Sequence, residues 1–503
     1  MNKLNCFNKA LNWIYANSIN NNGITVTSKQ KIVYPEVTGY YIPTLIQWGE
    51  IDLALSYAKC MCSLQKEDGA WYDSADEYPY IFDTAQILKG LVAVYKYLPV
   101  VKENIIKGCD WLLSQMDSNG RLKPAFDGCF PKDETFYSEL IHTYCLSPLV
   151  DASKMFGKPE YEQAAIKIKN YYISNYKEKI LNFSLLSHFY AYVMEALYDL
   201  GEIDLCRQSM MNLEKYRNKK GGIPGLKNVP WVCSTGIFQL AVVWYKLGEL
   251  EKGNSLFYYA LSLQNETGGW YGSYPAPSVF AQFYTGRKKP YYFPDEEISW
   301  ANKYFLDALA LKEKLEFEKM APSFIDDIAD DDGRYVLIKK LLSTANMGGG
   351  QVCDVGCGKG RYLKRLTKDF PSMHFYATDL SRNVMENITD VQEKRIGGLT
   401  CIPYENDRFD FVYVCEAFEH AIHIKSAFKE LYRITKKGGR FVIIDKPLEK
   451  LGALEIYEWE QWIDDNDIRQ FTQECGGSLE IVKSVPYEGR DDGLFRAWIV
   501  TKR

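Results

Sequence analysis

The chain has 503 residues and a formal net charge of −5 at pH 7. This length exceeds one ordinary hydrophobic core and predicts two to four domains. The acidic balance argues against a general nucleic-acid-binding or acidic-membrane surface. No apolar run reaches the length of a transmembrane helix, and the first residues lack the continuous apolar core of a signal peptide. We therefore expect a cytoplasmic protein with no membrane span and no nucleic-acid partner.

Thirteen cysteines are scattered along the chain without a regular spacing, and their number is odd. This pattern does not predict a disulfide framework. The five histidines do not combine with the cysteines into a zinc ligand set, so we expect no bound metal.

Residues 1–315 are predicted to be all-α and to repeat a two-helix unit. Apolar residues recur at steps of three and four, as at Leu53, Tyr57 and Met61, which is typical of a helix with one buried face. A glycine after each such helix is expected to end it, and another apolar helix follows. A further unit near Tyr171 keeps the helix without the glycine, which gives six hairpins. The glycines recur at about 50 residues or twice that number: Gly23, Gly69, Gly120, Gly221 and Gly268.

Two of these repeats carry one further pattern, Gln65-x-x-x-Gly69-x-Trp71 and Gln264-x-x-x-Gly268-x-Trp270. The pattern is similar to the Q-W repeat of terpenoid-cyclase toroids, in which the glutamine ties helix ends and the tryptophan covers them. The architecture also resembles the (α/α)6 barrels of glycoside hydrolases, polysaccharide lyases and uronyl epimerases. The resemblance implies an (α/α)6 toroid with a cavity at the N-terminal ends of its inner helices.

The segments expected to begin the inner helices are rich in aromatic and acidic residues. Aromatic rings stack on the apolar faces of sugars, and carboxylates accept hydrogen bonds from hydroxyl groups. We therefore predict a carbohydrate pocket with Glu36, Asp83, Glu139 and His188 as candidate acid and base groups. The alternative, that these residues cap helices and satisfy one another, stays open.

Residues 316–333 are predicted to be an acidic linker. The run from Asp326 to Asp332 has the letters of a terpenoid-cyclase acid motif, but it lies beyond the last hairpin. We interpret it as a solvated charge run, and we do not expect a terpenoid cyclase.

Residues 334–503 are predicted to form an α/β domain that begins with an amphipathic helix at 334–344. A buried strand, Gln351 to Val355, runs into the glycine turn of Asp354-x-Gly356-x-Gly358-x-Gly360. A strand, a glycine turn and a helix begin a nucleotide-binding βαβ unit. The spacing differs from the G-x-G-x-x-G turn that holds the pyrophosphate of a dinucleotide.

The segments that follow continue the alternation of strands and helices. A strand ending at Asp379 places a carboxylate about twenty residues past the glycines, where such folds bind ribose. Ser381 is expected to cap the next helix. The remaining predicted elements are a strand at 409–414, a helix at 429–435 stopped by Gly438 and Gly439, a strand at 441–444, and a closing antiparallel pair at 479–485 and 494–501.

These segments together resemble class I S-adenosylmethionine-dependent methyltransferases of the type 11 or 12 group. The likeness rests on the glycine turn, on Phe409-Asp410-Phe411-Val412, on Glu419-His420 and on the glycine pair. It implies a Rossmann-like fold over residues 334–503 and S-adenosylmethionine as cofactor. An acid that often meets adenine is missing before Ile402, so the adenine contact stays open. The cofactor-binding residues implied are Asp354, Gly356, Cys357, Gly358, Gly360, Asp379, Leu380 and Cys415.

Methyl transfer requires an aligned acceptor and, for an oxygen acceptor, a general base that works near neutral pH. His420 follows a strand at the carboxyl edge where ligands bind, and Glu416 and Glu419 are candidates to orient it. His423 is a second candidate base. A purely structural role for Glu419 and His420 is the alternative.

The leading hypothesis is a two-domain enzyme that O-methylates a sugar or glycoconjugate precursor, as surface polysaccharide biosynthesis requires, while the toroid binds or modifies the glycan. Three alternatives remain: a toroid that is itself a hydrolase, lyase or epimerase, a toroid that is a non-catalytic scaffold, and a terpenoid or quinone-like lipid as methyl acceptor. The predicted partner is a small-molecule or glycan substrate. The sequence does not indicate an oligomeric state.

Overall fold

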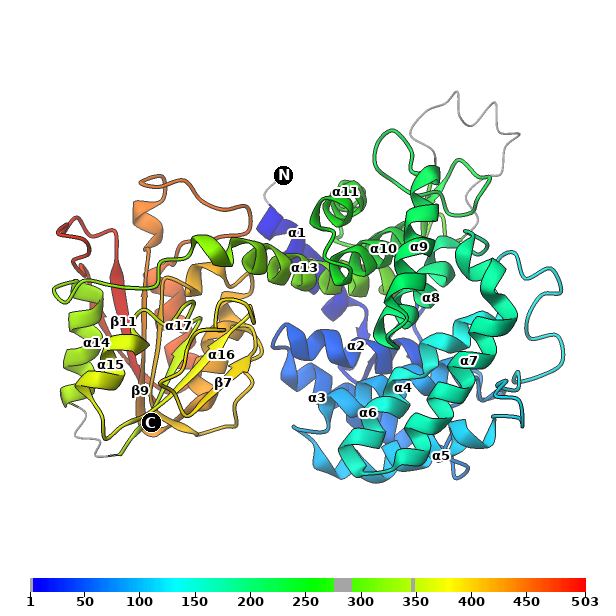
Figure 1. The fold of residues 1–503 in the computed structure, drawn as a ribbon, viewed down its shortest axis with the longest axis horizontal. Helices are drawn as coiled ribbons and strands as arrows, with labels where there is room; N and C mark the ends of the chain where they lie inside the picture. Colours follow the sequence, from blue (N-terminus) through cyan, green and yellow to red (C-terminus); the bar gives the residue numbers. More distant parts are fainter. Residues whose placement is uncertain (1–2, 276–291, 345–348) are drawn as a thin grey trace. The chain divides into compact units, whose positions relative to one another are not determined.

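The computed structural model describes residues 3–275, 292–344 and 349–503. The chain divides into two compact units (Figure 1). The helical unit comprises residues 1–46 and 50–313, and the α/β unit comprises residues 47–49 and 314–503. Within the described ranges, every helix is too short or too polar to span a lipid bilayer.

The helical unit alternates helices buried all round with helices buried on one face. Nearly every residue of α2, α4, α8 and α10 is buried, as expected for helices that are enclosed by others. The α3, α5, α9 and α11 helices bury one face. The helices are α1 (Lys3–Ala16), α2 (Pro35–Gln47), α3 (Ile51–Leu64), α4 (Ile81–Val94), α5 (Lys102–Ser114), α6 (Ser147–Phe156), α7 (Pro159–Leu181), α8 (Ser187–Asp199), α9 (Ile203–Leu213), α10 (Ser234–Lys246), α11 (Leu250–Leu261) and α13 (Ser299–Met320).

Short elements complete the helical unit. The 3-10 helix η2 is buried along its whole length and packs against α4 and α8, where the repeat predicts an inner α-helix. The repeat unit predicted near Tyr171, which lacks the glycine, corresponds to α7. The short elements are η1 (Pro99–Val101), η2 (Glu139–Cys145), η3 (Glu214–Tyr216), β1 (Ser18–Ile19), β2 (Gly23–Ile24), β3 (Val232–Cys233) and β4 (Ser273–Tyr274).

Four of the glycines that mark the repeats lie in turns of the same geometry. Their φ angles fall between 96° and 98°, a region in which a side chain is strained. In each turn the glycine N–H donates to the carbonyl three residues earlier. A Cβ atom added to any of them would lie 2.2–2.8 Å from an atom of another helix. These residues are Gly69, Gly120, Gly221 and Gly268.

The glycines do not stop the helices, which corrects that expectation. The α3 helix ends at Leu64, and Gly69 lies in the turn that follows. Gly23 lies in the short strand β2 instead of such a turn. What the glycines provide is close approach of the turn to another helix, because a side chain at Gly69 would meet the carbonyl oxygen of Lys107 in α5.

The glutamine and tryptophan of the first Q-W pattern hold that turn in place. Gln65 Nε2 donates to the carbonyl oxygens of Gly69 and Asn104, at 2.9 Å each. The indole Nε1 of Trp71 donates to the carbonyl oxygen of Met61 at 2.7 Å. The turn is thereby tied both to α3, which precedes it, and to α5.

The second Q-W pattern makes the same bonds, but its partner is the first helix of the chain. Gln264 Nε2 donates to the carbonyl oxygens of Gly268 at 3.0 Å and Cys6 at 2.9 Å. Trp13 of α1 donates to Glu297 Oε2 at 2.7 Å. The end of the helical unit is thus bonded to its beginning.

The α/β unit contains one seven-stranded sheet of order β10-β11-β9-β8-β5-β6-β7. The strands β5 to β9 pair in parallel, and β11 and β10 add antiparallel at one edge, as the sequence predicts for the closing pair. The elements are α14 (Gly333–Thr344), β5 (Gln351–Val355), α15 (Leu363–Asp369), β6 (His374–Asp379), β7 (Glu393–Ile396), β8 (Phe409–Cys415), α16 (Ile424–Ile434), β9 (Thr435–Asp445), α17 (Asp465–Glu474), β10 (Ser478–Val482), β11 (Arg496–Thr501), and the 3-10 helices η4 (Ala321–Ser323), η5 (Phe418–His420) and η6 (Leu448–Lys450).

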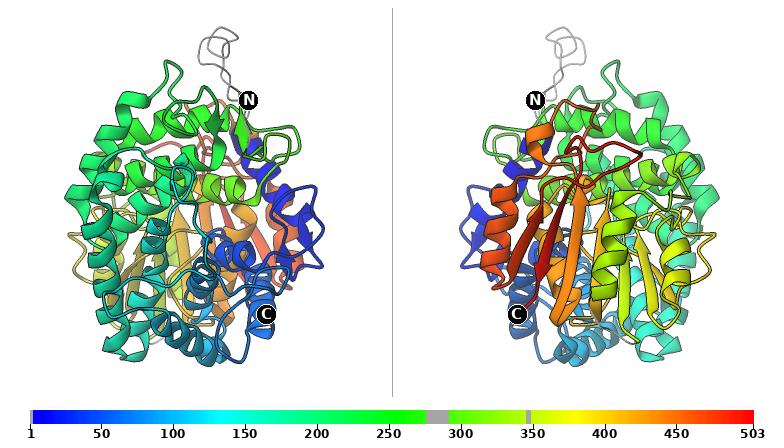
Figure 2. Two further views of the ribbon diagram at one scale, coloured as in Figure 1. Left: turned by 90° about the vertical axis from the view of Figure 1, so that its right-hand side faces the viewer. Right: turned by 90° about the vertical axis from the view of Figure 1, so that its left-hand side faces the viewer.

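Alternate side chains of each strand enter two separate cores, because successive residues of a strand point to opposite faces. In β8, Phe411 and Tyr413 join the core under α14 and α15, whereas Val412 and Val414 join the core under α16 and α17. Figures 1 and 2 show these helix pairs on opposite faces of the sheet. The nearly continuous apolar runs of these strands follow from burial on both faces.

Two local predictions for this unit need correction, and one strand was missed. Residues 382–387 form turns in place of the helix expected after Ser381, whose Oγ accepts from the Val384 N–H at 3.4 Å. Gly438 and Gly439 lie inside β9, because the chain enters this strand directly at the end of α16. The strand β7, at Glu393–Ile396, was not predicted from the sequence.

Candidate functional site

The carboxyl ends of β5, β6 and β8 meet at the point where the strand order reverses. From β5 the chain adds β6 and β7 on one side, and it then returns to add β8 and β9 on the other. In open α/β sheets ligands bind in the crevice at such a switch point. The register places Val355 beside Thr378 and Asp354 beside Tyr413, so the segments after these strands share one edge.

The glycine turn after β5 lies at this edge. Gly356, Gly358 and Gly360 all have positive φ angles, of 71°, 52° and 74°. A Cβ atom on Gly356 would lie 2.5 Å from the Cβ of Ala417, so a side chain at this position is excluded. A Cβ atom on Gly358 would meet no atom closer than 4.0 Å. The loop at Gly358 therefore faces open space.

Asp379, at the end of β6, holds the glycine turn. Its Oδ2 accepts from the Gly358 N–H and its Oδ1 from the Ser381 N–H, at 2.9 Å each. Burial raises the pKa of Asp379, and these backbone donors oppose the rise. Each carboxylate oxygen has a second lone pair, so Asp379 can accept further bonds from a ligand with two hydroxyl groups.

Asp354 is the most enclosed acid of this edge. It is buried at the end of β5, and its Oδ2 has no hydrogen-bond partner in the described part of the chain. Burial is the main cause that raises the pKa of Asp354 to about 8; the Tyr413 hydroxyl opposes this rise and the nearby Asp379 adds to it. A buried polar atom without a partner is costly, and a donor on a ligand would satisfy it.

The remaining predicted cofactor residues lie at the same edge. Cys357 is buried in the glycine turn, and Leu380, half-buried, follows Asp379. Cys415 ends β8 and donates from Sγ to the Tyr362 hydroxyl at 3.1 Å. The structure thus brings all eight predicted residues to the ends of three adjacent strands.

Residues 353–443 match a family model described as a methyltransferase domain. The α/β unit contains a class I methyltransferase domain. The cofactor of this domain is S-adenosylmethionine.

Curated relatives match the methyltransferase domain and its surroundings. An uncharacterized protein of Methanocaldococcus jannaschii is 26% identical over 155 residues, which cover 31% of this chain and 65% of that protein. The sterol 24-C-methyltransferase of Schizosaccharomyces pombe is 26% identical over 146 residues, which cover 27% of this chain and 35% of that protein. In both cases the match spans less than two thirds of the relative.

Solved structures of methyltransferases show a weak likeness to part of the chain. A S-adenosylmethionine-dependent methyltransferase from Clostridium acetobutylicum is 14% identical, with a TM-score of 0.29. The likeness covers 37% of this chain and 96% of that structure.

The residues of the methyltransferase domain fit the cofactor. S-adenosylmethionine carries two ribose hydroxyl groups and an ammonium group, all of which donate hydrogen bonds. Asp354 and Asp379 supply acceptors for them, and the open face of Gly358 leaves room for the ligand backbone to approach. The same acids would repel a pyrophosphate, in agreement with the spacing of the glycines.

His420 is the last residue of η5, a short helix that begins shortly after the end of β8 and Glu416. Its side chain is 21% exposed and contacts the rings of Phe317 and Tyr457, at 5.1 and 6.2 Å between centroids. Burial lowers the pKa of His420 to about 4, so the imidazole is neutral at pH 7. Nε2 lies 3.7 Å from Glu419 Oε1.

The two glutamates predicted to orient His420 have other partners. Glu419 is buried and paired with Lys446, whose Nζ lies 2.6 Å from Oε2. The carboxylate of Glu416 accepts from Arg334 and Arg361. Two guanidinium groups attract this carboxylate more strongly than a neutral imidazole does, which corrects the expectation that Glu416 orients His420.

Sequence inspection missed this arginine pair. Arg361 follows the last glycine of the turn. Arg334 is the second residue of α14 and is also bonded to buried Asp332 at 2.7 Å. Glu416, which they hold, has a positive φ of 54°, a conformation that is strained in a non-glycine residue and that recurs at functional sites. A basic residue next to a glycine turn was the available signal.

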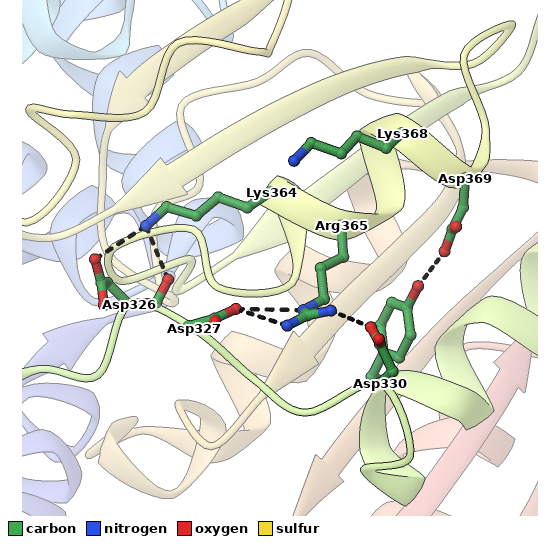
Figure 3. Close-up of a pocket in the computed structure, with 8 residues that line it drawn as sticks. Asp326, Asp327, Asp330, Lys364, Arg365, Lys368 and Asp369 are labelled. Atoms are coloured by element: carbon green, nitrogen blue, oxygen red, sulfur yellow. Dashed lines mark hydrogen bonds and ion pairs between the residues drawn. The ribbon is translucent and has the colours of Figure 1, made fainter.

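The acidic run at 326–332 is anchored to the methyltransferase domain. Asp326 pairs with Lys364 at 3.1 Å and Asp327 with Arg365 at 3.0 Å, and both cations belong to α15 (Figure 3). These aspartates remain largely exposed, so each pair contributes little to stability.

The helical unit contains a cavity of about 440 Å³ at the first turns of its buried helices. Glu36 lies in the first turn of α2, Asp83 in that of α4 and His188 in that of α8. All three line the cavity. The structure therefore brings three of the four predicted residues together at one cavity, and their role as acid or base groups stays a prediction.

Glu139 does not line this cavity, which corrects its assignment as an acid or base there. Its carboxylate accepts from Arg121 Nε at 2.8 Å and from the Tyr176 hydroxyl at 2.5 Å. A carboxylate so paired already has its acceptor oxygens occupied. The arginine lies in a preceding loop, and no local sequence pattern indicates the pairing.

Proposed function

We propose that this chain transfers a methyl group from S-adenosylmethionine to a sugar or glycoconjugate precursor, of the kind that surface polysaccharide biosynthesis uses. The transfer takes place in the cytoplasm, where the thiols that this chain carries stay reduced. The helical unit binds the glycan. The acceptor atom is a hydroxyl or carboxylate oxygen.

The observation that carries the methyl-transfer part is the edge formed by Asp354, Asp379 and the open face of Gly358. Bound S-adenosylmethionine supplies an electrophilic methyl group, so the protein needs chiefly to align the acceptor. His420 is neutral and can accept a hydroxyl proton, although a base with a pKa near 4 is weak.

The glycan part of the proposal takes the helical unit to be an (α/α)6 toroid. Its support is the alternation of enclosed and half-buried helices, and the bonds of Gln264 and Glu297 to α1. The cavity at the first turns of α2, α4 and α8 has the aromatic and acidic lining that suits sugar rings. A hydrolase, lyase or epimerase would use the same cavity, and a scaffold would leave it without turnover.

Calorimetric titration of the full chain with S-adenosylmethionine tests the cofactor site. Asp379→Ala removes acceptors for ribose, and we expect affinity to fall by about 1–3 kcal/mol. Asp390→Ala, at an exposed aspartate, is the matched control and should leave affinity unchanged. An unaltered affinity in Asp379→Ala would remove this residue from the site.

The acceptor is then found by mass spectrometry after incubation with S-adenosylmethionine and a panel of nucleotide sugars, oligosaccharides and lipids. A mass increase of one methyl group on a sugar supports the proposal. Chain cleavage or epimerisation of a glycan without the methyl donor favours a second active site in the helical unit. Methylation of lipids alone contradicts the proposal.

A lipid acceptor is the second candidate, favoured by a run of exposed apolar side chains after β9. Leu448, Leu451, Leu454, Ile456 and Tyr457 are each 43–63% exposed. The run follows the strand whose carboxyl end lies beside that of β8, and Tyr457 contacts His420. One relative is named a sterol methyltransferase, which agrees with an apolar acceptor.

A further inference from the structure

The cavity of the helical unit has an aromatic wall. Its ring-bearing residues come from the first turns of α4, α8 and α13 and from loops between helices. His188 and Tyr192 lie 4.4 Å apart between ring centroids, and Phe82 lies 5.0 Å from Tyr192. Such a wall can cover the apolar face of a small ring and can also attract a cation. The rings of this aromatic wall include Tyr34, Phe82, Phe189, Tyr192, Tyr292 and Trp300.

Among the described residues, every lysine, arginine, aspartate or glutamate side chain that lines the cavity is an acid. Glu36, Asp73 and Asp83 line it, and within the described residues no lysine or arginine does. Burial lowers the pKa of both His142 and His188 to about 3, so these two imidazoles add no positive charge at pH 7.

Glu36 has one carboxylate oxygen without a partner of normal hydrogen-bond geometry. The residue is 3% exposed, and in the described ranges neither its Oε1 nor the Nε1 of Trp300 has such a partner. Burial raises the pKa of Glu36, and the neighbouring Asp83 raises it further. The Trp300 indole is close enough to lower the pKa of Glu36. Asp83 accepts from the Tyr34 hydroxyl at 3.3 Å, and burial raises its pKa to about 7.

Two lysines lie near the cavity but outside its lining, so neither takes the place of a bound cation beside Glu36. Lys303 of α13 is paired with Asp307 at 2.6 Å and lies over the rings of Tyr40 and Tyr304. The Lys89 ammonium of α4 lies 3.0 Å from the centroid of the Tyr144 ring. Both lower the pKa of Glu36, but neither lines the cavity.

We propose that this cavity binds a monosaccharide-sized ring that carries a protonated amine, that is, an amino sugar with a free ammonium group. The ammonium group would lie against Glu36 and Asp83, and the apolar face of the ring against the aromatic wall. A uronic acid is disfavoured because, among the described residues, its carboxylate would meet Glu36, Asp73 and Asp83 and no lysine or arginine of the lining. The inference rests on the proposed function only in taking the ring to be a sugar. Of the two acceptor oxygens proposed above, hydroxyl and carboxylate, an amino sugar of this kind carries only the hydroxyl.

Calorimetric titration of the full chain without S-adenosylmethionine tests this inference with four probes: glucosamine, glucose, cyclohexylamine and glucuronate. We expect glucosamine to bind about tenfold more tightly than glucose, as a desolvated cation beside carboxylates and rings requires. Glucuronate should be the weakest ligand. Cyclohexylamine separates the ammonium contribution from that of the hydroxyl groups, and it should bind more weakly than glucosamine.

Proton release gives a second readout that needs no variant. A cation favours the ionised form of Glu36, so glucosamine should displace protons at pH 6, whereas glucose should not. The binding enthalpy of glucosamine should therefore depend on the ionisation enthalpy of the buffer. Equal affinities for glucose and glucosamine, preference for glucuronate, preference for cyclohexylamine or failure of all four probes to bind would each overturn the inference.

Glu36→Gln keeps the shape of the side chain and removes its charge. It should reduce the preference for glucosamine over glucose to less than about threefold. Asp83→Asn is a second variant in case the first does not fold, and Glu251→Gln, at an exposed glutamate of α11, is the control. If glucosamine binds as expected but no sugar is methylated, the cavity assignment stands and the proposed methyl transfer to sugars fails.

Discussion

Each unit of the chain contains a buried carboxyl group with an oxygen that has no partner in the described residues. These groups are Asp354 in the methyltransferase domain and Glu36 in the helical cavity. Burial raises the pKa of both. Because a buried acid destabilises the fold unless it is paired, such groups gather where a ligand completes the pairing.

Gly356 is a position of the methyltransferase domain that does not tolerate a side chain. In Gly356→Ala the new Cβ would lie 2.5 Å from Ala417 at a φ of 71°, so the turn must move. We expect affinity for S-adenosylmethionine to fall by about tenfold or more. Ala417→Gly removes the clashing atom and should restore part of the affinity, although the backbone strain of the alanine remains.

Binding of S-adenosylmethionine to the two single variants and the double variant, measured by calorimetry, gives the coupling between the sites. Ala417→Gly alone is the control and should bind normally. Additive losses in the double variant would mean that the contact does not explain the requirement for glycine.

The sequence identified the residues of the cofactor edge because they follow strand ends in a fixed order. It failed at Glu139 and Glu416, where the partner decides the role. Arg121 and Arg361 lie at other positions of the chain, and their approach depends on loop geometry that no local pattern encodes.

At the scale of elements, the repeated glycine turns make up the joints between helices of the helical unit. The structure shows that the requirement for glycine has two causes, the positive φ and the approach of another helix. Gly69 has both, since a Cβ would lie 2.5 Å from the Lys107 carbonyl oxygen. Gly157, at the end of α6, has a φ of 67° and an open surrounding.

Comparison of Gly69→Ala with Gly157→Ala separates these causes. Gly157→Ala should lower the free energy of unfolding by about 1–2 kcal/mol through backbone strain alone. Gly69→Ala should cost about 1–3 kcal/mol more, because the added methyl group overpacks the joint. Urea denaturation followed by circular dichroism measures both, and equal losses would contradict a steric role for Lys107.

Elements with long apolar periodicity, such as β5, β8 and α10, were predictable from the sequence because burial alone specifies them. The strand β7 was missed because its burial alternates weakly at the sheet edge. The 3-10 helix η2 was missed for another reason: its seven residues are all buried, so their apolar pattern does not distinguish it from an α-helix.

At the scale of the whole molecule, the pH dependence of stability combines opposite contributions. The pKa of His142 is lowered from 6.5 to about 3, chiefly by burial, so the unfolded state binds more protons between these values. Stability from this residue is present above pH 6.5 and is lost as the pH falls. The pKa of Asp354, raised to about 8, acts in the reverse direction above pH 4.

The variant His142→Gln isolates the first contribution. Between pH 7 and pH 4.5 the wild type should lose about 2–3 kcal/mol more stability than the variant does. The lower pH lies about two units below the pKa of the unfolded state, and each unit corresponds to about 1.4 kcal/mol. Urea denaturation at both pH values measures the difference. His374→Gln, at an exposed histidine, should behave like the wild type, and a matching loss in His142→Gln would show that burial of this imidazole is not linked to protons.

The bond between Gln264 and the first helix has a consequence for synthesis on the ribosome. Cys6 emerges early, but the side chain that binds its carbonyl oxygen is made about 260 residues later. At ~5–20 residues per second, α1 therefore waits about 13–50 s with its apolar face uncovered. During that interval the nascent chain depends on chaperones or on transient partners. Termination of translation before residue 264 would leave an amphipathic helix that is prone to aggregate.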